Sequence, residues 1–85
     1  MIKKIFAVYD NVAKVFDAPV VVRHEAEAVR GFTDGVKSPD TMLNKSPDDY
    51  ALHLIGTFDD VTGEVTVDGA CEVLSARSII GDVSE

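Results

Sequence analysis

The sequence has few of the side chains from which catalytic and metal sites are built. Among 85 residues it holds one cysteine, Cys71, and two histidines, His24 and His53. A single thiol excludes both an intramolecular disulfide and a multi-thiolate metal site within one chain. No nucleophile stands at a recognisable spacing from a base, and no glycine-rich phosphate loop is present. We therefore expect a protein that is not an enzyme and that holds no metal or cofactor.

Long hydrophobic runs are also missing. The apolar segment at the N-terminus, MIKKIFAVYD, contains two lysines and is interrupted by Asp10 well before it reaches the length of a signal core or a membrane span. The sequence thus predicts neither a targeting signal nor contact with a membrane. The lone cysteine fits the reducing interior of a cell.

Positive charge is scarce and unevenly placed. Eight Lys and Arg residues stand against fifteen Asp and Glu residues, which gives a formal net charge of -7. Residues 1–37 hold six of these cations and five carboxylates, whereas residues 38–85 hold two cations and ten carboxylates. An acidic surface repels phosphate backbones, so any surface that binds an anion is expected in the first part of the chain.

The length predicts a single domain, residues 1–85, with a core close to the lower limit of what holds itself together. Ile2–Tyr9 is typical of a strand and is apolar on both faces, with Phe6 and Val8 on one and Ile5 and Ala7 on the other. Such a strand needs cover on two sides. We therefore expect a homodimer.

Glu25–Lys37 is the best candidate for a helix. Its apolar residues recur at spacings of three and four, and acids open it while a lysine ends it. Gly31 and Gly35 weaken the helix and are expected to let its backbone approach the sheet closely. A short strand, Val20–Val22, precedes it. The expected fold is α+β, with one amphipathic helix packed on a small, mostly antiparallel β-sheet.

The second half predicts a hairpin. Thr41 is placed to cap one helical turn, and Ser46 precedes a proline at the start of another. From Tyr50 onward apolar residues recur at every second position, as in a strand, and one face holds Tyr50, Leu52, Leu54 and Phe58. The segment DDVTG then forms a turn, with Gly63 supplying a positive φ, and the chain returns as a second strand. Residues 70–80 have both helical and strand-like spacing; we expect a strand there and a frayed end at 81–85.

Single-stranded nucleic acid would be bound by cations together with exposed rings on which bases stack. Phe6, Tyr9 and Phe16 are the ring candidates in the basic part of the chain. His53, mid-strand between leucines, is expected to be structural, and Cys71 a small buried side chain. The predicted nucleic-acid-binding residues are Lys3, Lys4, Lys14, Arg23, Arg30 and Tyr9.

A longer pattern points to a family. The segment RGFTDGVKSPDTMLNKSPDDYALHLIGTFDDVTG, preceded by IFAVYD, resembles the small non-structural protein of gokushoviruses, microvirus phages with circular single-stranded DNA genomes. The matching positions are Phe6, Val8, Tyr9, Asp10, Arg30, Phe32, Asp34, Pro39, Thr41, Lys45, Pro47, Asp49, Tyr50, Leu52, Gly56, Phe58, Asp59, Asp60, Thr62 and Gly63. The resemblance implies a replication-associated protein of the host bacterial cytoplasm, acting in the shift toward single-stranded genome synthesis.

Two hypotheses follow. In the first, the protein binds single-stranded DNA as a homodimer, so that two weakly basic surfaces act together. In the second, an acidic surface that includes Asp48, Asp49, Asp59 and Asp60 binds a basic patch on the viral replication initiator or on a host replication protein.

Overall fold

Helix α1 (Glu25–Lys37) forms with the bounds predicted from the sequence and supplies much of the core. The structure, a computed structural model, describes residues 1–81 of the chain, except for the side chain of Asp68. The α1 N-terminus is held by Glu27, whose carboxylate accepts hydrogen bonds from the backbone N–H groups of Arg23 and His24 at 2.8 and 3.2 Å. These two bonds favour the ionised carboxylate, so the pKa of Glu27 is lowered.

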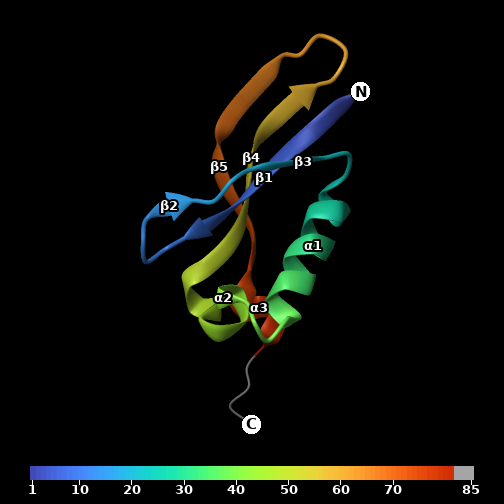
Figure 1. Ribbon diagram of the computed structural model, residues 1–85. Coiled ribbons are helices and arrows are strands. Elements are labelled where there is room, and N and C mark those ends of the chain that lie inside the picture. The colour runs from blue at the N-terminus through green and yellow to red at the C-terminus, as the bar shows by residue number, and fades with distance from the viewer. Residues whose placement is uncertain (82–85) are drawn as a thin grey trace.

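Within residues 1–81, five antiparallel strands form one sheet, which confirms the predicted α+β fold. The strands are β1 (Ile2–Asp10), β2 (Val15–Phe16), β3 (Val20–Val22), β4 (Tyr50–Asp59) and β5 (Val65–Ser75). Their order is β2-β1-β4-β5, and β3 pairs with β1 on the same edge as β2. Figure 1 shows β1 and β4 running through the middle of the molecule, with α1 alongside them. The two-residue strand β2 was not predicted.

One face of the sheet packs on the helices. Phe6 and Leu52 project from this face, and they form a buried cluster with Ala28, Phe32 and Val36 of α1 and with Ala76. Because side chains alternate along a strand, the neighbours Ala7 and His53, which are paired across β1 and β4, lie on the opposite face. We call this opposite side the open face of the sheet.

A bulge changes the face of one predicted core residue. Phe6 pairs with Leu54 and Ile5 pairs with Gly56, so Ile55 is skipped in the register of β4 against β1. One extra residue reverses the alternation beyond it. Phe58 therefore pairs with Lys3 and shares the open face with it, and the prediction that Phe58 shares a face with Leu52 and Leu54 was wrong.

Two short helical segments connect α1 to β4. Helix α2 (Met42–Lys45) is capped by Thr41, whose hydroxyl accepts a hydrogen bond from the Asn44 N–H at 3.2 Å, as predicted. The 3-10 helix η1 (Pro47–Asp49) begins with its proline as predicted, but the Ser46 side chain makes no capping bond. The backbone carbonyl of Ser46 accepts from the Asp49 N–H instead.

The strand predicted over residues 70–80 is correct only as far as Ser75. There β5 ends and helix α3 (Ala76–Ile80) begins. Ser75 is the N-cap, with its hydroxyl accepting from the Ser78 N–H at 3.2 Å, and Ala76 is fully buried in the core. Gly81, at φ 79°, ends the helix. The fraying expected at the C-terminus falls mostly on residues 82–85, which lie outside the described residues.

The close backbone approach occurs at a strand glycine, not in the helix. A Cβ at Gly31 would meet nothing within 4 Å, and one at Gly35 would meet Leu43 of α2 rather than the sheet. At Gly56, by contrast, a Cβ would lie 2.1 Å from the carbonyl oxygen of Thr66 in β5. The expectation for the helix glycines was therefore wrong. The turn glycine behaves as predicted, since Gly63 has φ 80°.

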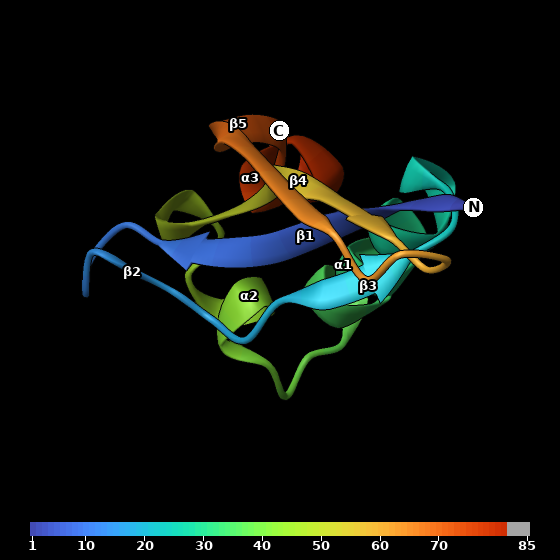
Figure 2. The ribbon, with the colours of Figure 1, turned by 90° about the horizontal axis from the view of Figure 1, so that it is seen from above.

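The molecule is elongated, with principal extents of 49 × 23 × 19 Å. Figure 1 shows α2 and α3 gathered at one end, while the β4–β5 hairpin and the N-terminus form the other end beyond the helices. Figure 2, seen from above, shows β1 between β3 and β4. Large apolar side chains stay exposed on the strands, among them Val20, Val21, Val65 and Val67. Within residues 1–81 no helix is long and apolar enough to cross a membrane.

Candidate nucleic-acid interface

Three ring side chains gather on the open face of the sheet. The ring centroids of Tyr9 and Phe16 are 4.7 Å apart, and His53 lies 5.6 Å from Tyr9 and 5.5 Å from Phe16. The rings come from β1, β2 and β4. The Phe16 side chain is 43% exposed, so part of this surface is available to a flat partner. We call Tyr9, Phe16 and His53 the ring cluster.

The local sequence explains how Phe16 reaches Tyr9. Asp10 ends β1 and accepts hydrogen bonds from the N–H groups of Val12 and Ala13 at 2.9 and 3.2 Å, which is the side-chain turn expected of an aspartate there. Lys14 adopts a left-handed conformation, φ 62°, and its N–H donates to the Asp10 carbonyl at 2.8 Å. The chain therefore reverses within four residues and pairs Phe16 with Tyr9.

The aromatic side chains predicted from the sequence to stack on bases differ in how exposed they are. Phe6 is fully buried beneath α1 and cannot stack on a base. Tyr9 and Phe16 are brought together, and His53 joins them although its neighbours Leu52 and Leu54 suggested a purely structural role. The sequence contains a signal that could have identified His53. In a strand alternate side chains point to opposite faces, so a histidine between two core leucines must point away from the core.

Lys14 is the predicted cation nearest to the ring cluster. It lies in the turn between Tyr9 and Phe16, and its ammonium donates to the Asn11 side-chain oxygen at 3.1 Å. This contact is to a neutral amide on an exposed turn, so the charge of Lys14 remains available to an anion. Lys14 and the ring cluster together provide a cation beside stacking surfaces.

Three other predicted cations lie at the far end of β1. Lys4 pairs with Val22, the residue before Arg23, so all three cations lie near the start of α1, although Lys3 and Lys4 point to opposite faces of the sheet. The ammonium of Lys3 is 3.6 Å from the carboxylate of Asp60, which also accepts a 2.6 Å hydrogen bond from the N-terminal amine. From Lys4 to Asp10 the strand spans roughly 20 Å at about 3.3 Å per residue. These cations are thus well separated from the ring cluster.

Arg30 stands apart from both groups. It is exposed on α1 and borders a shallow surface hollow with Ala26 and Glu27. The six residues predicted to bind nucleic acid therefore fall into three places: Tyr9 with Lys14, then Lys3 with Lys4 and Arg23, and Arg30 alone.

The acidic residues of the second hypothesis do not form one surface. Asp48 and Asp49 precede β4, whereas Asp59 is its last residue and Asp60 follows it, roughly 30 Å away along the strand. Asp48 is engaged by Arg77 through two bonds of 2.8 and 3.0 Å, which lower the pKa of its carboxyl. The N-terminal amine similarly lowers the pKa of Asp60.

Acids also border one side of the ring cluster. A surface hollow of about 320 Å³ is lined by Tyr9 and His53 together with Asp48, Asp49 and Glu72. Phosphates approaching from this side would be repelled. Among residues 1–81 there is no group of three or more His, Cys, Asp or Glu side chains that could hold a metal ion. Cys71, expected to be buried, is exposed.

Comparison with known proteins places the chain in a phage family. A family model described as Phage ORF5 protein matches residues 3–79, which include both the ring cluster and the core. No curated protein and no solved structure gives a significant match. Because the match covers nearly the whole chain, the protein belongs to the Phage ORF5 protein family.

Proposed function

We propose that this phage protein is a gokushovirus non-structural protein that binds single-stranded DNA during viral genome replication, in the host bacterial cytoplasm, and so favours single-stranded genome synthesis. Membership of a phage family and the resemblance to the gokushovirus protein support the setting. In this role the protein binds DNA and catalyses no reaction, and it uses neither a metal nor a cofactor.

The observation that carries the proposal is the ring cluster. Flat side chains on an open sheet face bind bases of any sequence, because every base has a π-face. Tyr9 and Phe16 supply two such rings at 4.7 Å, with Phe16 partly exposed, and Lys14 lies in the turn that joins their strands. Each stacked base is worth about 1–3 kcal/mol, which is enough for weak binding despite the acidic chain.

Further phosphate contacts come from the separated cations if two copies act together. In a homodimer one DNA strand can contact Tyr9 and Lys14 of one copy. The same DNA strand can then contact cations of the other copy, either Arg30 or the group of Lys3, Lys4 and Arg23. The exposed valines of β3 and β5 support association, because side chains such as Val67, 67% exposed, gain from burial. Light scattering at micromolar concentration should give a dimer mass, and a monomer there would contradict the dimer.

Fluorescence anisotropy with a labelled oligothymidine of about 15 nucleotides tests DNA binding. We expect binding at about 20 mM salt that weakens at about 150 mM, with a slope of about -0.7 in log K against log salt for each phosphate neutralised. Phe16→Ala should weaken binding about 5- to 150-fold, the equivalent of one stacked base. Phe16→Leu, which keeps apolar bulk but removes the ring, should weaken it nearly as much.

Matched charge variants separate a specific site from general electrostatics. Lys14→Asn suits the left-handed backbone at this position and should weaken binding. Lys45→Asn removes the same charge from helix α2 and should leave affinity close to that of the parent. The proposal is refuted if no DNA binds at low salt, or if the Phe16 variants bind as well as the parent.

A further inference from the structure

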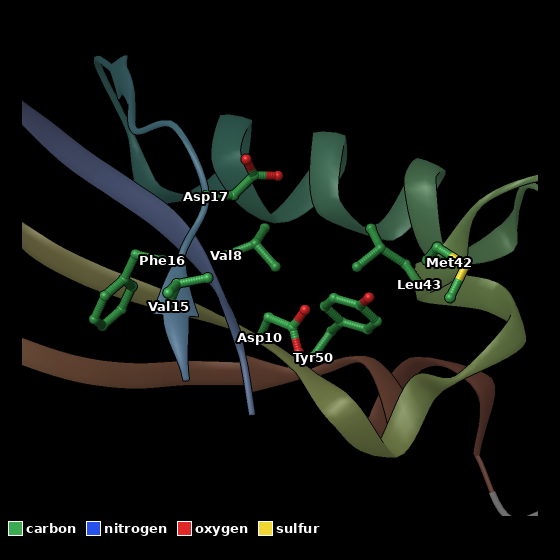
Figure 3. A pocket seen from close by; sticks show the side chains of 8 residues that line it. All are labelled: Val8, Asp10, Val15, Phe16, Asp17, Met42, Leu43 and Tyr50. Carbon is green, nitrogen blue, oxygen red and sulfur yellow. The ribbon is translucent and has the colours of Figure 1, made fainter. Parts of the chain in front are cut away.

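A second concave site lies on the helix side of the same β1–β2 hairpin. It is a pocket of about 440 Å³ between strands β1 and β2, helix α2 and the start of β4. In Figure 3 Val8, Leu43 and Tyr50 surround the hollow, with Asp10 beside the Tyr50 ring and Asp17 beyond Val8. The ring of Phe16, which also borders the pocket, points away from its middle.

The floor and rim of the pocket are apolar. Val8 and Leu43 pack against the buried core, so the floor is fixed by the fold. The rim residues Val15 and Met42 remain 54% and 57% exposed. Exposed apolar side chains around a hollow that already has an apolar floor favour an apolar occupant.

The mouth of the pocket is negative. Asp10 and Asp17 each use one carboxylate oxygen, Oδ1, to accept backbone N–H groups of the next few residues. Among the residues that the structure describes, no Lys, Arg or His borders the pocket. Burial and the nearby carboxylates of Asp10, Asp49 and Asp17 raise the pKa of the Tyr50 hydroxyl, as expected where negative charge collects. This potential attracts cations and repels phosphates.

We propose that this pocket binds a basic peptide segment of a partner protein. One large aliphatic side chain enters between Val8 and Leu43, and Lys or Arg residues flanking it in the peptide pair with Asp10 and Asp17. The apolar floor selects the aliphatic residue and the two carboxylates select its neighbours, so neither a purely apolar nor a purely basic segment satisfies the site.

A second copy of this chain does not supply such a segment. The stretch in which adjacent lysines stand next to large aliphatic residues is Ile2–Ile5, and it lies within β1. That strand is already paired with β4 on one edge and with β3 on the other, and Ile5 is 9% exposed. The occupant is therefore a different protein, basic where this one is acidic.

The pocket shares Phe16 at its border with the ring cluster, but its other lining residues lie outside that cluster. Val8 and Asp10 alternate along β1 with Tyr9, so the two sites use opposite faces of one hairpin. A peptide in the pocket leaves the open face uncovered. The proposal therefore does not depend on DNA binding, and either site can be present without the other.

Three synthetic peptides of about nine residues test the proposal, a length that spans the pocket with flanking cations. The first has a central leucine flanked by lysine and arginine, the second replaces the leucine with serine, and the third replaces the basic residues with glutamate. Binding is followed by anisotropy and by amide shifts of the ¹⁵N-labelled full chain. We expect the first peptide to bind and shift Val15, Asp17, Met42 and Tyr50, and the second to bind about 10-fold more weakly or worse. The third should not bind.

Charge-reversal variants provide the matched control. Asp17→Lys should weaken the leucine peptide about 10-fold or more, whereas Asp34→Lys, the same change at an exposed site on α1, should have little effect. Met42→Ser, at the rim, should also weaken it, and amide spectra report whether each variant is folded. The proposal is overturned if the serine peptide binds equally well, if shifts appear elsewhere, or if folded Asp17→Lys binds like the parent. Concentration-dependent shifts of the pocket residues without peptide would show self-association there and would equally overturn it.

Discussion

Replacing Gly56 with alanine should be among the most damaging single-methyl changes in this protein. The added Cβ would lie 2.1 Å from the Thr66 carbonyl oxygen and 3.1 Å from the Cα of Val67, both backbone atoms of β5. Contacts under 3.0 Å are essentially never made by a Cβ, so β4 and β5 must separate by about 1 Å at this point. Such overpacking costs about 1–3 kcal/mol, and we expect the upper end because backbone rather than a side chain must move.

The cost is large relative to the total stability. A domain of this length has a free energy of unfolding of about 4–13 kcal/mol, and about 3 kcal/mol corresponds to a fall in Tm of about 10–25 °C. Urea unfolding and thermal melting followed by circular dichroism measure both quantities. Gly31→Ala is the matched control: nothing lies within 4 Å of its Cβ, so the better helix propensity should stabilise α1 by about 0.5–1 kcal/mol. A Gly56→Ala variant within about 0.5 kcal/mol of the parent would refute the register of β4 against β5.

Three further predictions concern the stability of the core, the cap of the last helix and the stability of the fold at acidic pH. Phe32→Ala, at a side chain 5% exposed, should lower the free energy of unfolding by about 3–5 kcal/mol in urea titrations. Ser75→Ala removes the hydroxyl that caps α3 and should lower the free energy of unfolding by about 0.5–2 kcal/mol. Ser75→Asp, which keeps a capping oxygen, should retain most of that stability. Glu27, Asp48 and Asp60 have folded-state pKa values below their ordinary values of 4.5, 3.8 and 3.8, so the folded state binds fewer protons than the unfolded state. Their stabilisation is complete above about pH 4.5 and is lost as pH falls through the lowered pKa values, so melting temperatures should decline below pH 4.5 and not between pH 5 and 7.

The parts of the fold that follow from local physical chemistry were predictable. Helix α1 combines a 3.6-residue apolar period with acids at its start and a lysine at its end, and all of these act within the helix itself. The DDVTG turn needs a positive φ at Gly63, a conformation that glycine adopts without steric cost. Such features need no knowledge of the rest of the chain.

The features that were missed depend on contacts between distant residues. Whether residues 76–80 continue as strand or turn into helix depends on the burial of Ala76 against α1, although Ser75 is a capping residue that the sequence did offer. The bulge that moves Phe58 to the open face appears only when β1 and β4 are aligned. The steric need for a glycine at position 56 likewise exists only once β5 lies against it.

The candidate site shows the same division. Lys14 and Tyr9 were predicted from composition and charge, and the predicted strand Ile2–Tyr9 already separates Lys3 and Lys4 from Tyr9. Only the pairing of β3 with β1 brings Arg23 to that far end. The ring cluster joins residues from three strands, and His53 enters it only through pairing with Ala7. The pocket beside Asp17 is formed where α2 packs against the sheet. No short sequence motif predicts that contact.

Amide chemical shifts of the ¹⁵N-labelled protein, recorded while oligothymidine is added at low salt, test the central proposal most directly. If bases stack on the open face, the largest changes will fall on Tyr9, Phe16 and His53 and on the turn that carries Lys14, and they will diminish as salt is raised. A spectrum unchanged at millimolar oligonucleotide, or changes confined to residues away from the ring cluster, would contradict it.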